Sequence, residues 1–95
     1  MSRFQVRYHP KVVAKDIRRL DPPTRRRIRS AIEHKLGDQP EQYAKPLAYT
    51  RSALWSLRVG DWRVVFALRA EQLWILRIGH RTEVYESLAD RGVPE

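Results

Sequence analysis

The sequence contains no cysteine among its 95 residues, and this absence excludes several kinds of chemistry. Disulfide bonds, thiolate catalysis and cysteine-ligated zinc all need that side chain. A small domain without disulfides does not require an oxidising compartment, so a cytoplasmic location is expected. Long apolar runs are also lacking, so no segment is predicted to cross a membrane. At this length we expect one domain covering residues 1–95.

Glycine and histidine are too few and too scattered to suggest a cofactor. The four glycines stand alone, so no glycine-rich phosphate loop is present. The three histidines (His9, His34 and His80) fall in different predicted elements, without the spacing of a metal site. We therefore expect neither a bound metal nor a cofactor.

Acidic residues are scarce, and this imbalance is the strongest signal in the composition. Nineteen basic residues face eleven acidic ones, which gives a net charge of +8, and arginine outnumbers lysine fifteen to four. The planar guanidinium group can bind a phosphate through two hydrogen bonds and can stack on bases. Nucleic acid is therefore the expected partner, with an anionic membrane or an acidic protein as alternatives.

The first half of the chain predicts one strand and two helices. Residues 4–8 alternate apolar and polar side chains, as in a half-buried strand. A first helix is expected from Pro10 to Leu20 and a second from Pro22 to Leu36. The apolar stripes expected on these helices are Val13, Ala14, Ile17 and Leu20 on the first and Ile28, Ala31, Ile32 and Leu36 on the second. Residues 38–53 show neither period and are predicted to be a loop.

The second half predicts an antiparallel meander of three strands. Gly60-Asp61 is a two-residue turn signal, and such a turn would place Arg58 directly opposite Arg63. We expect a three-residue turn at 70–72, because a two-residue turn would bury Arg77 among apolar side chains. The longer turn places Trp74, Leu76 and Ile78 on the core face.

The predicted fold is therefore α+β: an N-terminal strand, an αα-hairpin and a three-stranded antiparallel meander, with both helices packed on one face of the sheet. The other face is expected to be uncovered and basic, with Arg58, Arg63 and Arg77 on it. Residues 90–95 are expected to form a loose tail.

Two groups of arginines have both a functional and a purely structural interpretation. Arg25, Arg26 and Arg29 lie near the start of the second helix, where they either hold backbone phosphates or form a solvated helix face. The Arg58–Arg63 pair places like charges opposite each other, which is destabilising. Either a carboxylate such as Asp61 or Glu83 compensates for this repulsion, or the pair binds an anion.

Three segments carry a family resemblance. They are Lys45-Pro-Leu, Trp55-Ser-Leu-Arg-Val-Gly-Asp-Trp-Arg-Val-Val-Phe66 and Ile75-Leu-Arg-Ile-Gly-His-Arg-Thr-Glu-Val-Tyr85. Together with the helix pattern they resemble the RelE/ParE superfamily of bacterial toxins, in particular its RelE-like mRNA interferases. The resemblance covers roughly residues 3–88. It implies a RelE-like toxin domain and a toxin of a type II toxin–antitoxin pair that cleaves mRNA in the ribosomal A site without a metal.

The resemblance also implies roles for individual residues. Arg63 corresponds to the arginine that stabilises the scissile phosphate, Arg81 to an arginine near the leaving group, and Tyr85 to the tyrosine that positions or deprotonates the 2′-hydroxyl. RelE-like toxins carry lysines on the preceding strand, where this chain has Leu54 and Ser56. Either Arg58 or His80 is then the candidate to supply the missing positive charge or the proton transfer. The remaining residues expected to contact RNA are Arg58, Arg77, Lys45, Arg25, Arg26 and Arg29.

The same resemblance implies partners and leaves alternatives open. A toxin of this kind acts on mRNA and the ribosome and is neutralised by a small acidic antitoxin, with which we expect a heterotetramer. A ParE-like inhibitor of DNA gyrase is the first alternative. A relative that only binds RNA or its partner, without catalysis, is the second.

Overall fold

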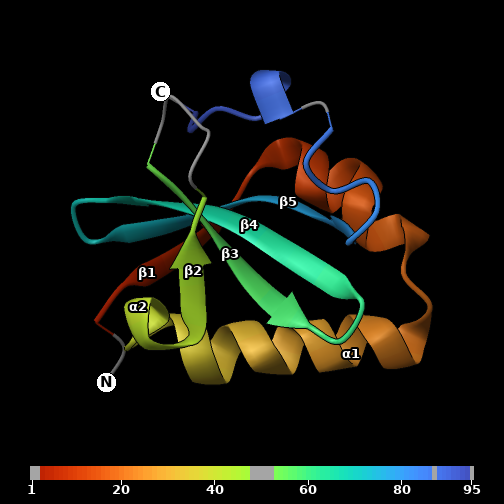
Figure 1. The fold of residues 1–95 in the computed structure, drawn as a ribbon, viewed down its shortest axis with the longest axis horizontal. Coiled ribbons are helices and arrows are strands. Elements are labelled where there is room, and N and C mark those ends of the chain that lie inside the picture. Colours follow the sequence, from red (N-terminus) through yellow and green to blue (C-terminus); the bar gives the residue numbers. More distant parts are fainter. Residues whose placement is uncertain (1–2, 48–52, 87, 95) are drawn as a thin grey trace.

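One mixed sheet of five strands organises the fold (Figure 1). The computed structural model describes residues 3–47, 53–86 and 88–94. The strands are β1 (Gln5–Tyr8), β2 (Ala44–Pro46), β3 (Leu54–Val59), β4 (Trp62–Arg69) and β5 (Gln72–His80). Their order across the sheet is β1-β5-β4-β3-β2, with β1 parallel to β5 and every other pair antiparallel. The α+β class is confirmed, and the sheet has one strand more than predicted.

Two long helical stretches follow β1, as the sequence predicts. The first comprises η1 (Val12–Asp16) and η2 (Ile17–Arg19), and the second comprises α1 (Pro22–Ala31) and η3 (Ile32–Leu36). The Asp21 side chain accepts a hydrogen bond from the backbone N–H of Thr24, and this N-cap fixes the start of α1. None of the described helices is long and apolar enough to cross a bilayer.

Both helical stretches cover one side of the sheet, which is called the helix face (Leu57, Val64 and Phe66). The apolar side chains of the helix face and of the helices form one hydrophobic cluster, the helix-face core. This cluster contains the apolar positions predicted for the second stretch, including the buried Ile28, Ile32 and Leu36. The stripe predicted for the first helix is confirmed at Leu20, which is buried, and at Ile17, which packs against the core. It is wrong at Val13, which is 57% exposed, and at Ala14, which is also exposed, whereas the neighbouring Val12 is buried.

The loop predicted over residues 38–53 is wrong in its first part. This segment contains a helical turn, α2 (Pro40–Tyr43), followed by the edge strand β2. Within that strand, Lys45 pairs with Ser56 of β3. Residues 48–52 of the predicted loop lie outside the described residues. A strand this short shows too little alternation to be recognised from its sequence.

The turn between β4 and β5 has two residues, so the predicted three-residue turn is wrong. Arg69 pairs with Gln72, which leaves Ala70 and Glu71 in the turn, and Ala70 has a φ of 54°. A bulge then changes the phase of β5, because Phe66 pairs with Ile75 while Val65 pairs with Arg77. Leu76 is the extra residue.

The bulge decides which side chains of β5 face the helices. Ile75 before it and Ile78 after it both join the helix-face core. Trp74 and Leu76 pack on the other side of the sheet, contrary to the prediction. Arg77 nevertheless lies on the predicted face, because its partner Val65 points there. The short turn and the bulge together avoid burying Arg77 in the core.

The opposite side of the sheet, here called the tail face (Val65, Ala67 and Leu76), is partly covered. The residues that follow β5, called the C-terminal segment, pack over it through the side chains of Val84, Leu88 and Val93. Leu88 belongs to the short helix η4 (Leu88–Asp90). The prediction of an entirely uncovered face is therefore wrong. The prediction of a loose tail is also wrong for residues 90–94, because Arg91 is only 4% exposed, while residue 95 of that predicted tail lies outside the described residues.

A buried ion pair fastens this C-terminal segment. Arg91 donates two hydrogen bonds to the Asp16 carboxylate, at 2.8 and 3.0 Å, and a third to the carbonyl of Leu76 at 2.9 Å. The Asp16 carboxylate also accepts from the N–H of Ile78 at 3.0 Å. The pair therefore satisfies backbone groups of β5 that lie beside the bulge and beyond the end of β1.

His9 ends β1 and makes the first helical stretch sensitive to pH. Its Nδ1 accepts a hydrogen bond from the Lys11 N–H at 3.0 Å, which requires that nitrogen to be unprotonated. Burial lowers the pKa of His9, and the nearby positive charges of Arg91 and Lys11 lower it further, against weaker opposing effects of Asp90 and Asp16. Protonation of His9 therefore favours the unfolded chain.

We expect stability to be greatest above about pH 6.5, the ordinary histidine value, and to fall as acidification approaches the lower pKa of folded His9. His9→Asn should weaken this decline, since an amide oxygen can accept the same hydrogen bond without titrating. Urea midpoints at pH 7.5 and 5.5 measure the effect. The exposed His34→Asn is the control and should keep the wild-type decline. An unchanged decline in His9→Asn would contradict this explanation.

Candidate functional site

The tight turn between β3 and β4 brings two arginines side by side. Gly60 has a φ of 62°, a conformation that favours glycine, and this turn pairs Arg58 with Arg63 in the predicted register. Arg63 lies between Trp62 and Val64, which point to the helix face, so its own side chain is on the tail face. Among the described residues, neither arginine forms an ion pair.

Arg63 is held in place by the backbone of this turn. Its Nη1 donates to the carbonyl of Gly60 at 2.8 Å and to that of Trp62 at 2.9 Å. Among the described residues, its Nε and Nη2 donate to no protein acceptor and remain available to a ligand. The guanidinium is thus positioned without being neutralised, which is the property that an anion site requires.

Arg81 reaches the same turn from the end of β5. Its backbone N–H donates to the carbonyl of Asp61 at 2.8 Å, and its Nε lies 3.6 Å from the Asp61 carboxylate. The Asp61 carboxylate, one candidate to compensate for the Arg58–Arg63 repulsion, therefore pairs with Arg81 instead. Both groups of this ion pair are exposed, so it contributes little to stability. Arg63 and Arg81 are brought together around one turn.

Tyr85 lies over the tail face, anchored by a side chain that the sequence analysis did not assign to the site. Its hydroxyl forms a 3.1 Å hydrogen bond with the hydroxyl of the buried Ser56, and the ring is 45% exposed. Ser56 pairs with Val65, two residues from Arg63, so the Cα atoms of Ser56 and Arg63 are diagonal neighbours roughly 7–8 Å apart. The signal for Ser56 was its hydroxyl within an otherwise apolar strand.

One row of side chains crosses the tail face at Ser56. Lys45 of β2 pairs with Ser56, Ser56 with Val65, and Val65 with Arg77 of β5. Lys45 is exposed, and Arg77 is half-buried with a buried Nε that has no partner among the described residues. Two predicted RNA-contacting cations therefore flank the hydroxyl pair of Ser56 and Tyr85.

His80 lies apart from Tyr85. Its ring packs edge-on against Trp62, with 5.6 Å between ring centroids, and its Nδ1 lies 2.9 Å from the hydroxyl of Thr82. Trp62 belongs to the helix-face cluster, so the imidazole is on the opposite side of the sheet from Ser56. The structure does not bring His80 together with the other three candidate catalytic residues.

The predicted phosphate-binding arginines of α1 are separated from Tyr85 as well. Arg25 donates to the carbonyl of Leu20 at 3.1 Å, Arg29 pairs with Glu33 at 3.1 Å, and Arg26 is exposed. The sheet lies between these side chains and the tail face, because α1 packs on the helix face. They can contact a large ligand only at a second surface.

The arrangement on the tail face can bind a phosphodiester. Guanidinium groups at Arg58, Arg63 and Arg81 surround one turn, and a phenol with a hydroxyl partner lies on the same face. No group of three potential metal ligands occurs in the part of the chain that the structure describes. Charge stabilisation and proton transfer are the chemistry that arginine, tyrosine and serine side chains can supply.

Solved structures support the fold assignment. The RelBE2 toxin–antitoxin complex of Mycobacterium tuberculosis contains a chain with a TM-score of 0.74 and 24% identity, over 82% of this chain and 98% of that one. The RelB–RelE antitoxin–toxin complex of Methanococcus jannaschii gives a TM-score of 0.64 and 17% identity, over 84% and 95% of the two chains. At these identities the similarity establishes a shared fold.

The family assignment comes from the sequence. No curated protein matches the chain. The sequence model described as the ParE toxin of the type II toxin–antitoxin system parDE matches residues 6–85, and this range contains every strand of the sheet except the first residue of β1. The chain therefore belongs to the ParE toxin family of type II toxin–antitoxin systems, within the RelE/ParE superfamily that its motifs resemble.

Proposed function

We propose that this toxin is a metal-independent endoribonuclease that cleaves mRNA in the ribosomal A site and thereby inhibits translation. One observation carries the proposal. Arg63 and Arg81 meet at the β3–β4 turn, and the phenol of Tyr85 lies on the same face as Arg63, beside Ser56. This is the set of groups that in-line cleavage of RNA by its own 2′-hydroxyl would require.

In the proposed reaction, the 2′-oxygen attacks the adjacent phosphorus and the bond from phosphorus to the 5′-oxygen breaks. Tyr85 orients the 2′-hydroxyl and, in its phenolate form, receives the proton of that hydroxyl, while the hydrogen bond with Ser56 fixes the ring oxygen. Arg63 stabilises the extra negative charge of the phosphorane, because a preorganised cation is worth most where charge develops. Arg81 stabilises the departing 5′-oxygen, which takes a proton from solvent, and the products are a 2′,3′-cyclic phosphate and a 5′-hydroxyl.

Lys45 supplies the ammonium group that the strand residues Leu54 and Ser56 do not. It belongs to the neighbouring strand but is paired with Ser56, so its Cβ lies within about 5.5 Å of the Ser56 Cβ. In this proposal it binds the substrate phosphate beside Tyr85. Lys45 lies on the neighbouring strand and on the same face as Ser56.

Tyr85→Phe is expected to abolish growth arrest and to reduce cleavage about 10²–10⁴-fold, the usual contribution of a proton-transfer group. Primer extension on cellular mRNA after induction measures new 5′ ends. Tyr43→Phe is a matched control, because Tyr43 is 47% exposed and Tyr85 45%. New 5′ ends at the wild-type level in Tyr85→Phe would contradict the role of the phenol.

Gyrase inhibition is the second candidate function. It is favoured by the description of the matching family as ParE toxins and by Leu54 and Ser56 at the positions of the RelE-like lysines. A supercoiling assay with purified gyrase separates the two functions. Inhibition of supercoiling, with no new 5′ ends in cellular mRNA, would favour the gyrase inhibitor.

We also propose that the partner is a small acidic antitoxin that forms a heterotetramer with the toxin. The net charge of +8 supports an acidic partner, as do the two solved complexes, in which related folds are bound to antitoxins. An acidic chain that folds over a basic surface neutralises it by charge pairing.

A further inference from the structure

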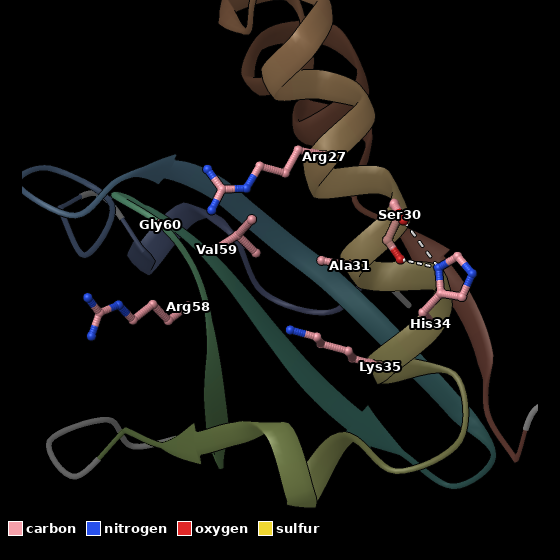
Figure 2. A pocket seen from close by; sticks show the side chains of 8 residues that line it. All are labelled: Arg27, Ser30, Ala31, His34, Lys35, Arg58, Val59 and Gly60. Atoms are coloured by element: carbon pink, nitrogen blue, oxygen red, sulfur yellow. Dashed lines mark hydrogen bonds between the residues drawn. The ribbon is translucent and has the colours of Figure 1, made fainter.

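A second basic site lies on the helix side of the β3–β4 turn. It is a pocket of about 460 Å³ between the second helical stretch and β3, and it is called the helix pocket (Figure 2). Its lining consists of Arg27, Ser30, Ala31, His34, Lys35, Arg58, Val59 and Gly60. Three of these side chains are cations and none is a carboxylate, so the lining carries a local excess of positive charge.

The cations of the helix pocket are available to a ligand. Arg27 of α1 and Lys35 of η3 are both exposed, and Figure 2 shows both reaching from the helix toward β3. Among the described residues, none of Arg27, Lys35 and Arg58 has a carboxylate partner. The ammonium of Lys35 lies 5.7 Å from the ring centre of Tyr43.

This pocket is continuous with the tail-face site through the turn itself. The guanidinium of Arg27 lies against Gly60, with its atoms 3.0–3.3 Å from the position that a Cβ would take. Arg63 holds the carbonyl of the same Gly60, and Arg58 pairs with Arg63. Positive groups therefore follow one another from the tail face, around the turn, into the helix pocket.

The row of positive groups formed by Arg63, Arg58, Arg27 and Lys35 is called the basic track. Its chemistry favours phosphates over carboxylates. One guanidinium satisfies both oxygens of a carboxylate, so an isolated acidic side chain would leave most of the track unneutralised. A nucleic-acid strand carries one negative charge at each nucleotide and can place successive charges along the whole track. Apolar anchor positions, which a folded peptide would need, are limited in this lining to Ala31 and Val59.

We propose that the helix pocket binds a backbone phosphate of the RNA strand adjacent to the phosphate held at Arg63. This proposal rests on the proposed function, since it takes RNA as the ligand of the tail face. Arg27 and Lys35 bind the phosphate directly, and Arg58 bridges the two sites. The pocket contributes to affinity and to the placement of the strand, and it takes no part in bond breaking.

The test is binding of a 2′-O-methylated RNA oligonucleotide, which cannot be cleaved because it lacks the attacking hydroxyl. Fluorescence anisotropy gives Kd for the full-length toxin over a series of salt concentrations. The variant is Arg27→Gln/Lys35→Gln, in which exposed helix positions keep their stems and lose their charges. The matched control, Lys15→Gln/Arg69→Gln, removes the same two charges from exposed positions outside the pocket lining.

We expect the pocket variant to bind the RNA about 10–100-fold more weakly than the control, the effect of losing charged hydrogen bonds to one phosphate. The slope of log K against log salt should become shallower by about 0.7. On cleavable RNA, KM should rise while kcat is unchanged, as expected for a residue that binds without acting in the transition state.

The binding result separates this proposal from the proposed function. If the wild type binds RNA through the pocket but cleaves none, the pocket stands and the nuclease fails. If the wild type cleaves RNA while the variant and control bind it equally, the pocket proposal is overturned. It is also overturned if the variant keeps its RNA affinity and instead loses affinity for an acidic antitoxin. Melting temperatures of both variants verify that they are folded.

Discussion

Arg91→Met is expected to lower the free energy of unfolding by about 3–5 kcal/mol, the usual result of removing one partner from a buried ion pair. Both side chains of the Arg91–Asp16 pair are 4% exposed. Methionine fills much of the volume but leaves the Asp16 carboxylate without its two guanidinium donors. The carbonyl of Leu76 loses its side-chain donor as well. The penalty is therefore mainly that of a desolvated, unpaired charge.

Urea unfolding followed by tryptophan fluorescence measures this loss. Lys11→Met is the matched control, because Lys11 pairs with Asp90 beside the same segment but at the surface, where an ion pair contributes little. Asp16→Leu in combination with Arg91→Met should recover part of the stability by removing the second charge. If Arg91→Met were no less stable than Lys11→Met, the buried pair would not be what holds the C-terminal segment.

Arg63→Ala is expected to reduce RNA cleavage about 10²–10³-fold, the effect of deleting one preorganised donor to a developing negative charge. The carbonyls of Gly60 and Trp62 fix the guanidinium before substrate binds. Little free energy is therefore needed to orient it during the reaction. The side chain is half-exposed, and its hydrogen bonds join it only to residues of the same turn. We therefore expect the fold to survive the change.

Single-turnover cleavage of ribosome-bound mRNA by purified toxin, with growth arrest in cells, measures the effect. Arg69→Ala is the matched control: it removes an exposed arginine from the same strand and the same face, near the opposite end of β4. Equal losses in the two variants would indicate that only overall charge matters. Full activity of Arg63→Ala would remove Arg63 from the mechanism.

The features that the sequence predicted correctly depend on local patterns. Gly60-Asp61 determines the turn, the turn determines the register, and the register places Arg58 opposite Arg63. The spacing of Ile28, Ile32 and Leu36 predicted the buried side of the second helical stretch. Each of these inferences needs only the period of an element and the length of a turn.

The features that were missed depend on contacts between distant segments. The bulge at Leu76 reverses the phase of half a strand without any sequence signature. The Arg91–Asp16 pair joins two elements whose contact no local pattern predicts, although Asp16 did carry a signal. It stands four residues from both Val12 and Leu20, so it lies in the apolar stripe of its helix, where a carboxylate needs a partner.

In the candidate site, too, some positions follow from local sequence patterns and others from contacts between distant segments. Arg63 and Arg81 could be assigned because both flank turns with recognisable residues. The side chain of His80 stands at the end of a strand, where it can turn to either face, and in the structure it packs on Trp62. Ser56 and the position of Lys45 beside it depend on the edge strand β2, which the sequence did not reveal.

The span of the Arg91–Asp16 contact has a consequence for folding kinetics. Its two residues are 75 positions apart in the chain, and the bond from Ile78 to Asp16 spans 62 positions. Contacts of such range form only after large loops close, which slows folding relative to helical proteins of similar size. We therefore expect the segment that carries Tyr85 over the sheet to acquire its final position late, after most of the chain has collapsed.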